Sequence, residues 1–385
     1  MDTDDKECYN YPGKAARVRF MPEPRMIREV QTMDNVKRIT DALTDLEAIL
    51  LISPTNRRYA TGFPSTEGTV LITRKSAHFF VDARYIEAAR NAIKGAEVEL
   101  VTNKYDWYAQ VNAVLKAEKI KKLAFEDGSV SCADFARMDE KLDAELVPES
   151  GLMSSLRAVK QQPEIETLIS AQRLAEKALD KVLGIIKPGM TEKEVAAELV
   201  YNMLKLGAEN VSFEPIVVTG EKSSMPHGVP GDKIIKKGDF LTMDFGCILG
   251  GYCSDMTRTV AIGKATKEMR KVYDTVLEAQ LAGIAAARAG VTGREVDKAA
   301  RDVIDAAGYG EYFGHSFGHS LGLDIHEFPN AMPTNNDPIP AGAVISAEPG
   351  IYLPGKFGVR IEDVIVLRED GCENITKAPK DLIIL

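Results

Sequence analysis

The sequence contains few cysteines, and they are too scattered to form a disulfide framework. Only five of the 385 residues are cysteine, and Cys247 and Cys253 lack the CxxC spacing of zinc and redox sites. We expect these two to be small core residues. No apolar run approaches the ~20 residues that a membrane-spanning helix needs, and the acidic first ten residues are unlike a signal peptide. These absences predict a cytoplasmic protein with no membrane partner.

An excess of positive charge is also missing. The chain has 48 lysines and arginines against 57 aspartates and glutamates, which gives a net charge of -9. Nucleic acid is therefore excluded as an expected partner. What remains is an ordinary globular composition, with 45% hydrophobic and 27% charged residues. At roughly 150 residues per domain, this length predicts two domains.

Short apolar runs alternate with helical stretches in the first part of the chain. Strand-like runs occur at 48–52, 69–81 (a hairpin), 98–101 and 123–125, and helical stretches at 84–93 and 107–118. Strands alternating with helices indicate an α/β domain, which we place at 26–155 after a polar leader over 1–25. We interpret His78, inside the hairpin, as a strand histidine and not as a ligand.

A long amphipathic helix opens the second part of the chain. Pro163 suits its first turn because the missing N–H would be unpaired there anyway, and the apolar spacing continues to Ile186. Further on, the pattern G-x-T-x-x-E-V occurs at 189–195 and again at 290–296. The Thr and Glu of each copy form a capping box, and similar elements flank both copies. We therefore predict a duplicated α/β domain over 160–385.

Two aspartates lie at the ends of neighbouring apolar runs. Asp244 ends one run, and Asp255 stands early in the next. The glycines between them suit a hairpin turn, which would bring the two carboxylates together. Two carboxylates that face each other repel, so this arrangement needs a cation to be stable.

Histidines and glutamates provide further candidate ligands. Glycines and a proline argue against a helix around His315 and His319, which would share one face if the segment were a strand. Glu348 and Glu362 each stand within a strand-like apolar run, where an unpaired carboxylate would be costly or protonated. Each position alone has a structural alternative, such as an ion pair between Glu362 and Arg360.

Taken together, these positions predict a metal site. One domain supplies four carboxylates and one imidazole, from Asp244, Asp255, His319, Glu348 and Glu362. Without a thiolate, this set suits Mn²⁺ or Co²⁺, with Zn²⁺ as a further candidate. Two such ions about 3.5–4 Å apart can activate water and polarise a carbonyl. The expectation is a two-metal hydrolase.

Six ordered segments resemble one known family. They read PHGVP, TMDFG, SDMTRT, GHSFGHSLGLDIHEFP, SAEPGIY and GVRIEDVI. They are similar to segments of the metallopeptidases with the pita-bread fold, above all the Xaa-Pro dipeptidases (prolidases) and Xaa-Pro aminopeptidases. The stretch from Asn56 to Ala89 resembles the smaller creatinase-like N-terminal domain of these enzymes. The resemblance covers nearly all of the chain beyond residue 25. It implies an α/β fold with a duplicated pita-bread catalytic domain.

The resemblance also implies which residues hold the metal ions. Asp244 would bind one divalent ion, while Asp255 and Glu362 would bridge both. His319 and Glu348 would complete the second ion, and Glu348 would also move a proton during the reaction. No metal-ligand position departs from the family pattern.

Four further residues take roles in the substrate pocket by the same resemblance. His227 and His326 would contact the substrate and steady the tetrahedral intermediate. His315 would line the same pocket, and Arg360 would brace the Glu362 side of the site.

The implied reaction is hydrolysis of the Xaa-Pro bond in dipeptides or at the N-termini of short peptides. A proline leaving group lacks an N–H and has a fixed φ, so a dedicated pocket makes chemical sense. The short segment 348–362 slightly favours small substrates, and relatives suggest a homodimer. Two alternatives stay open: non-peptidase chemistry of the creatinase or dimethylsulfoniopropionate lyase type, and a non-catalytic binding protein. The complete ligand set argues against both.

Overall fold

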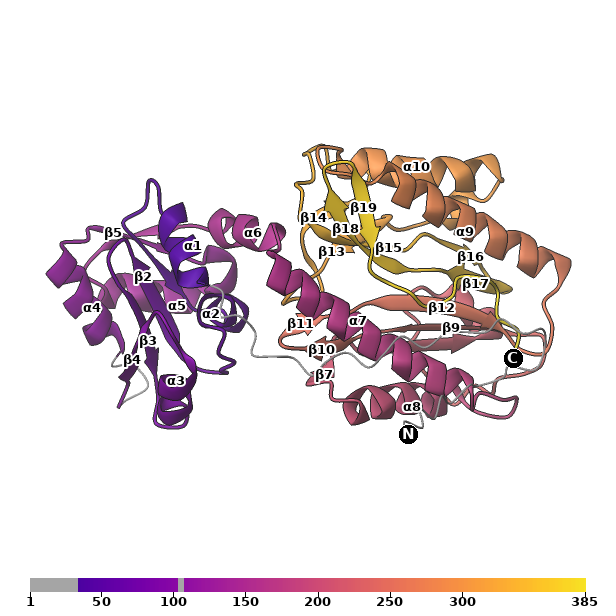
Figure 1. The fold of residues 1–385 in the computed structure, drawn as a ribbon, viewed down its shortest axis with the longest axis horizontal. Helices are drawn as coiled ribbons and strands as arrows, with labels where there is room; N and C mark the ends of the chain where they lie inside the picture. Colours follow the sequence, from indigo (N-terminus) through magenta and orange to yellow (C-terminus); the bar gives the residue numbers. More distant parts are fainter. Residues whose placement is uncertain (1–33, 103–106) are drawn as a thin grey trace, which may run out of the picture. The chain divides into compact units, whose positions relative to one another are not determined.

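The computed structural model describes residues 34–102 and 107–385, and Figure 1 shows their helices and strands. The predicted leader over 1–25 lies outside the described residues. Among the described helices, none is long and apolar enough to cross a membrane.

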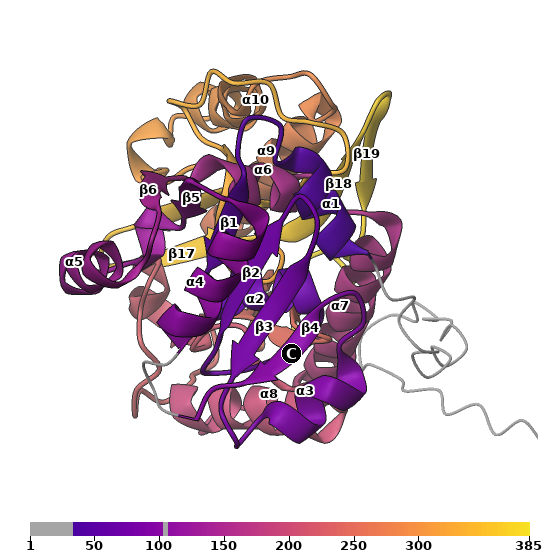
Figure 2. The same ribbon diagram turned by 90° about the vertical axis from the view of Figure 1, so that its left-hand side faces the viewer.

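The first group of elements builds one six-stranded sheet with helices on both faces. In chain order they are α1 (Asn35–Ala42), β1 (Ala48–Leu51), α2 (Pro54–Thr61), β2 (Thr69–Thr73), β3 (Ala77–Val81), α3 (Ile86–Ala92), β4 (Glu97–Leu100), α4 (Trp107–Glu118), β5 (Lys122–Phe125), η1 (Asp127–Ser129), α5 (Cys132–Lys141), β6 (Glu145–Pro148) and α6 (Gly151–Ala158). The strand order is β4-β3-β2-β1-β5-β6. Figure 2 shows β2, β3 and β4 side by side, with β4 at the edge.

Alternate residues of β1 enter two different cores, which explains why this sheet is covered on both faces. Ile49 and Leu51 pack in a cluster with residues of α1, α2 and α3. Ala48 and Leu50 pack in a second cluster with residues of α4 and α5. The predicted strands, the 69–81 hairpin and both predicted helices of this part are confirmed within two or three residues at their ends.

The second group contains four long helices and, among the described residues, sheets of two to five strands. Its elements are α7 (Gln162–Leu183), α8 (Glu192–Lys205), β7 (Asn210–Val211), β8 (Ile216–Thr219), η2 (Gly220–Ser224), β9 (Phe240–Phe245), β10 (Cys247–Leu249), β11 (Tyr252–Cys253), β12 (Met256–Ala261), α9 (Lys267–Ala286), α10 (Gly293–Ala306), η3 (Gly310–Tyr312), β13 (Gly318–Ser320), β14 (Glu327–Ala331), β15 (Val344–Ala347), β16 (Gly350–Leu353), β17 (Phe357–Arg360), β18 (Asp363–Arg368) and β19 (Gly371–Asn374).

Each half of this second group has its own helix pair and its own core. Apolar residues of α7 and α8 pack with β8, β9 and β12, and those of α9 and α10 pack with β15 to β18. Figure 1 shows the two helix pairs on different sides of the strands. Cys247 and Cys253 are buried and free, as predicted.

The predicted repeat is visible in the hydrogen bonding. Thr191 and Thr292 are the N-caps of α8 and α10, and both capping boxes are formed. Before each cap the glycine N–H donates to an isoleucine carbonyl, Gly189 to Ile235 and Gly290 to Ile339. Because backbone contacts recur together with the caps, the two halves repeat one structural unit. The long helix α7 begins as predicted but ends at Leu183, earlier than the expected Ile186.

Candidate metal centre

Asp244 and Asp255 are brought together by an antiparallel pair of strands. Asp244 lies on β9 opposite Thr257 of β12, and Asp255 immediately precedes β12. The backbone of Asp255 exchanges two hydrogen bonds with the side chain of Gln172 on α7. Gly246, just after Asp244, allows the close crossing, because a Cβ there would lie 1.9 Å from the carbonyl oxygen of Ser254. The hairpin prediction for this segment is confirmed.

Glu348 and Glu362 lie at strand ends and not within strands, which corrects the prediction. Glu348 directly follows β15, and Glu362 stands between β17 and β18. Strands β15 and β18 pair so that Ala347 faces Asp363, so the two glutamates leave the sheet at the same end. Glu362 also donates its N–H to the carbonyl of Thr257, at 3.1 Å. This contact joins the glutamates to the aspartates across the two halves of the repeat.

His319 lies on β13, whereas His315 precedes that strand by three residues. The expectation that both histidines share one strand face is therefore wrong. The register of this strand with β14 shifts between Gly318 and Ser320. The imidazole of His315 instead contacts Tyr352 of β16, whose hydroxyl lies 2.9 Å from its Nε2.

Three of the candidate ligands already have metal-binding spacing. Single ligand atoms of Asp255, His319 and Glu362 all lie within 4.8 Å of one another. Nε2 of His319 lies 3.5 Å from Asp255 and 3.4 Å from Glu348. Its Nδ1 lies 3.2 Å from the carbonyl of Ser320, which can only accept, so Nδ1 carries the proton. The lone pair of Nε2 therefore faces two carboxylates, an arrangement that a cation stabilises.

The carboxylates themselves also fit divalent cations. Three buried carboxylate oxygens have no hydrogen-bond partner within the described part of the chain: Oδ1 of Asp244, Oδ1 of Asp255 and Oε1 of Glu362. Burial raises the pKa of Asp255 well above its ordinary value, and Asp244 and Glu348 nearby add to the shift. Burial, followed by Asp255, likewise raises the pKa of Glu362. A hard cation replaces the protons that these groups would otherwise hold.

The donor set therefore fits two divalent ions, and the neutral form of His319 matches it. Burial lowers the pKa of His319 below its ordinary value, which favours the unprotonated imidazole that binds metals. Ser346 connects His319 to Glu348, because its hydroxyl accepts a hydrogen bond from the backbone N–H of His319 and donates one to Glu348.

Arg360 braces the site mainly through Asp244. Its Nη2 donates to Asp244 at 2.6 Å, and its Nε donates to Thr257, whose hydroxyl donates to Glu362. Hydrogen bonds thus link Arg360 to Glu362 through Thr257. That Arg360 braces the Glu362 side of the site stays a prediction. Burial alone would lower the pKa of Arg360, but Tyr352 and Asp244 hold it above its ordinary value.

Tyr352 is a functional candidate that the sequence did not indicate. Its hydroxyl accepts from Nη1 of Arg360 at 2.8 Å and lies 2.9 Å from Nε2 of His315. An arginine cannot accept, so the tyrosine proton must be directed at His315. Nδ1 of His315 then donates to the carbonyl of Ser316. Tyr352 thus fixes the tautomer of His315, whose pKa is lowered by burial.

His227 and His326 lie at the exposed side of the site. The rings of His326 and His319 are 4.4 Å apart and edge-to-face. Burial lowers the pKa of His326, and His319 and His227 contribute to the same shift. His326 also lines a cleft of about 220 Å³ together with Ser154, Arg157, Asp324, Glu327 and Phe328.

A buried glutamate positions the loop that carries His227. Glu192 on α8 is completely buried and accepts hydrogen bonds from the backbone of Thr219 and Gly231. It also pairs with Lys222 at 2.6 Å, and Lys222 donates to the carbonyl of Val229. Nothing in the sequence distinguishes Glu192 from the other acids of its helix, so this role could not be predicted.

Fold and site together define a metal-dependent hydrolase with a duplicated catalytic domain. A family model described as metallopeptidase family M24 matches residues 166–369. A second model, the creatinase/prolidase N-terminal domain, matches residues 34–159. The chain belongs to metallopeptidase family M24, and its C-terminal domain has the pita-bread fold. Membership in this family implies divalent metal ions.

Individual relatives cover almost the whole length. An uncharacterized peptidase of Bacillus subtilis is 42% identical, over 88% of this chain and 96% of its own. The structure of an Xaa-Pro dipeptidase from Bacillus anthracis is 43% identical with a TM-score of 0.88, covering 92% of this chain and 99% of its own. An X-Pro aminopeptidase from Thermotoga maritima is 38% identical with a TM-score of 0.86, covering 90% and 99%.

Proposed function

We propose that this enzyme hydrolyses the peptide bond that precedes proline, in dipeptides or at the N-termini of short peptides. The observation that carries the proposal is the convergence of Asp255, His319 and Glu362, whose ligand atoms lie within 4.8 Å of one another. The names of the similar B. anthracis and T. maritima structures support the Xaa-Pro bond as the target.

Five residues would hold the metals in this proposal: Asp244, Asp255, His319, Glu348 and Glu362. When bound, the two divalent ions supply an activated water and polarise the substrate carbonyl. The oxygens without partners on Asp244, Asp255 and Glu362 support these assignments. Mn²⁺ or Co²⁺ is the proposed ion, with Zn²⁺ as a further candidate.

The remaining residues bind the substrate and handle protons. Glu348 has a pKa raised chiefly by burial, which suits a carboxyl that accepts a proton and passes it to the leaving proline nitrogen. The five proposed metal ligands are together called the catalytic cage. His326 and His227 lie on its exposed side, where their N–H groups can donate to the substrate carbonyl oxygen as negative charge develops there. His315, held by Tyr352, lines the same pocket.

The short segment between Glu348 and Glu362 gives a slight preference to small substrates. Residues 350–360 form the β16–β17 hairpin, in which only residues 354–356 connect the two strands. We therefore propose a preference for dipeptides over longer peptides. Because the similar structures include both a dipeptidase and an aminopeptidase by name, a direct rate comparison is required.

The test is a substrate panel on metal-depleted enzyme. After chelation, Mn²⁺, Co²⁺ or Zn²⁺ is added back, and rates on Leu-Pro and on Xaa-Pro-Yaa tripeptides are compared. We expect restored hydrolysis of Leu-Pro with the highest rates for Mn²⁺ or Co²⁺. A strong tripeptide preference would replace dipeptidase by aminopeptidase. Absence of cleavage before proline with every ion would refute the proposed function.

A single substitution tests the metal assignment. Asp255→Asn removes the charge of a bridging ligand while keeping its size, so we expect loss of both tight metal occupancy and turnover. Asp302→Asn is the matched control, because Asp302 is exposed on α10 and pairs only with Lys298 in the described structure. Full activity of Asp255→Asn would contradict the assignment.

Three further statements about this chain belong to the same proposal. We expect a homodimer, a cytoplasmic location, and domain boundaries at 26–155 and 160–385. Size-exclusion chromatography with light scattering tests the first, and limited proteolysis near residue 160 tests the last.

A further inference from the structure

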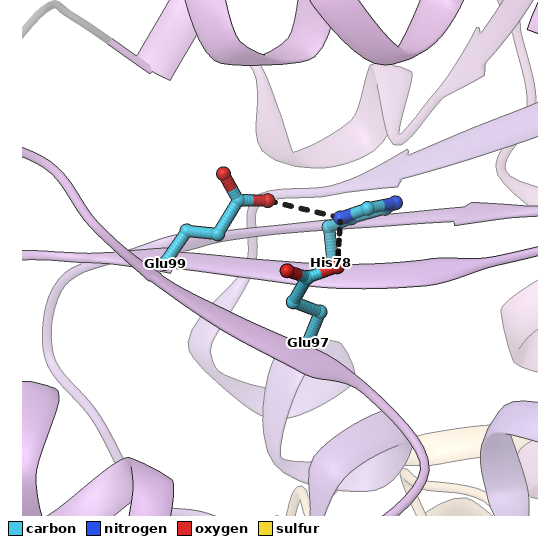
Figure 3. Close-up of side chains that lie close together, drawn as sticks. All are labelled: His78, Glu97 and Glu99. Carbon is cyan, nitrogen blue, oxygen red and sulfur yellow. Dashed lines mark hydrogen bonds and ion pairs between the residues drawn. The ribbon is translucent and has the colours of Figure 1, made fainter. Parts of the chain in front are cut away.

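A second group of metal-type ligands lies far from the catalytic cage in sequence, on the sheet of the N-terminal part. His78 is on β3, and Glu97 and Glu99 are on the neighbouring edge strand β4. The parallel register places His78 opposite Glu97 and Phe80 opposite Glu99. Residues two apart on a strand share a face, so all three side chains project to one side of the sheet. Figure 3 shows both carboxylates facing the same imidazole nitrogen.

The distances suit one ion bound between the three groups. Nδ1 of His78 is 2.9 Å from Glu99 and 3.9 Å from Glu97, and one ligand atom of each residue lies within 4.8 Å of the others. In a tetrahedral zinc site with bonds of about 2.0–2.1 Å, ligand atoms are about 3.3 Å apart. The two observed distances lie on either side of that value, so small side-chain rotations are sufficient.

The hydrogen bonds behind His78 determine which nitrogen is free. Ser76 has a single hydroxyl proton and donates it to Glu118, whose carboxylate can only accept. The hydroxyl oxygen of Ser76 therefore accepts from Nε2 of His78, at 2.8 Å. Nε2 carries a proton, and Nδ1 must present either a second proton or a bound cation to Glu99.

This arrangement is the one that metal-binding histidines use. A ligating imidazole donates its other N–H to a hydrogen-bonded partner, which fixes the ring and raises its basicity. Here the partner is Ser76, backed by Glu118, and the ring is also held by stacking on Phe80 at 5.9 Å. His319 in the catalytic cage has the same design, with Nδ1 bound to a carbonyl and Nε2 facing carboxylates.

Burial and charge also favour a cation between His78, Glu97 and Glu99. The side chain of His78 is only 12% exposed, while Glu99 is 30% and Glu97 is 72% exposed. A cation can therefore enter from solvent along Glu97 and reach a preformed imidazole. Glu97 and Glu99 face Nδ1, and Glu118 lies behind Ser76 on the Nε2 side of the ring. In the described ranges, no lysine or arginine pairs with any of these three carboxylates.

We propose that His78, Glu97 and Glu99 form a third metal site, independent of the catalytic pair, which binds one Zn²⁺ or a similar divalent transition ion. One imidazole and two carboxylates give a three-ligand set with a fourth position for water, typical of such ions. The strands supply a rigid frame, because two of the ligands come from adjacent positions of one sheet ladder. The ion would fasten the edge strand β4 to β3.

The test counts metal ions in the full-length enzyme saturated with Zn²⁺ and freed of excess ion. Three ions per chain are expected for the unchanged enzyme and two for His78→Gln, with peptidase activity unaltered in the variant. Asp255→Asn separates the sites, since it should lose catalytic ions but keep the ion at His78. Equal counts for the unchanged enzyme and His78→Gln would overturn the proposal and make Nδ1 the carrier of a proton in a simple ion pair.

A milder variant guards against a folding defect. Glu97→Gln alters a solvent-exposed side chain, and we expect at least a roughly tenfold weaker affinity for the third Zn²⁺. Glu87→Gln, on the exposed surface of α3, is the matched control and should bind three ions. Anomalous difference maps from crystals of the zinc-saturated enzyme should show a peak at bonding distance from Nδ1 of His78. Unchanged affinity in Glu97→Gln, or no such peak, would also refute the site.

Discussion

Tyr352→Phe tests how a single hydroxyl orders the substrate side of the catalytic site. The hydroxyl accepts a hydrogen bond from the buried guanidinium of Arg360 and donates one to Nε2 of His315. Phenylalanine keeps the ring and its packing but removes both contacts. A hydrogen bond to a charged group contributes about 1.5–3 kcal/mol, and Nη1 of Arg360 would keep only a 3.3 Å contact with the carbonyl of Pro226.

We therefore expect Tyr352→Phe to lower the free energy of unfolding by about 2–3 kcal/mol. Urea unfolding of the metal-loaded enzyme measures this loss. Tyr273→Phe is the matched control, because Tyr273 is also buried but donates only one hydrogen bond, to the neutral carbonyl of Lys380. Its expected loss is about 1 kcal/mol.

Activity provides a second measurement on the same variant. Without the tyrosine hydroxyl, Nε2 of His315 loses the hydrogen bond that orients the ring, so the ring can turn away from the pocket. Misplacing a group by about 1 Å can cost as much as 10²-fold in rate, and we expect at least a tenfold fall in kcat for Leu-Pro. A loss of stability no larger than that of Tyr273→Phe, combined with unchanged kcat, would refute the role assigned to Tyr352.

Two other predictions concern buried charge. Lys160 and Arg157 hold the pKa of Glu327 below its ordinary value, although burial alone would raise it. Because breaking a buried pair costs about 3–5 kcal/mol, Lys160→Met should lower the free energy of unfolding in urea by about 3 kcal/mol. A change under 1 kcal/mol would contradict this role. Burial raises the pKa of Asp255 and Glu362, so without metal these groups stabilise the fold only while protonated. The melting temperature of chelated enzyme should therefore fall relative to metal-loaded enzyme as pH rises from about 5 to 8, and parallel curves would be inconsistent with the shifts.

Local patterns were sufficient to predict much of the fold. The capping boxes at Thr191 and Thr292 follow from a four-residue rule, and the start of α7 follows from Pro163 and the helical spacing after it. The hairpin joining Asp244 to Asp255 follows from glycines between two apolar runs. All of these depend on residues close together in the sequence, where backbone preferences dominate.

The site was harder to predict wherever the outcome depended on long-range contacts. Glu348 and Glu362 look like strand residues because apolar residues flank them, yet both lie where strands end and the chain crosses to another sheet. Arg360 donates to Asp244 and to Thr257, and Thr257, on a strand far away in the sequence, donates to Glu362. No sequence spacing encodes that geometry.

The surroundings of His78 also depend on a long-range contact that its own segment does not reveal. On its own strand it is flanked by phenylalanines and looks like a structural residue, and its place on β3 is confirmed. Glu97 and Glu99 approach it only because β4 pairs with β3 in parallel across an intervening helix. A parallel pairing of this kind cannot be recognised from the two strand sequences alone.

The most direct test of the central claim is anomalous diffraction from crystals of the Mn²⁺-loaded enzyme. The account predicts two peaks between β9, β12, β13 and β18, both in contact with Asp255 and Glu362, with Asp244 on one ion and His319 and Glu348 on the other. A single peak, or peaks that do not share Asp255 and Glu362, would contradict the two-metal centre from which the proposed reaction is derived.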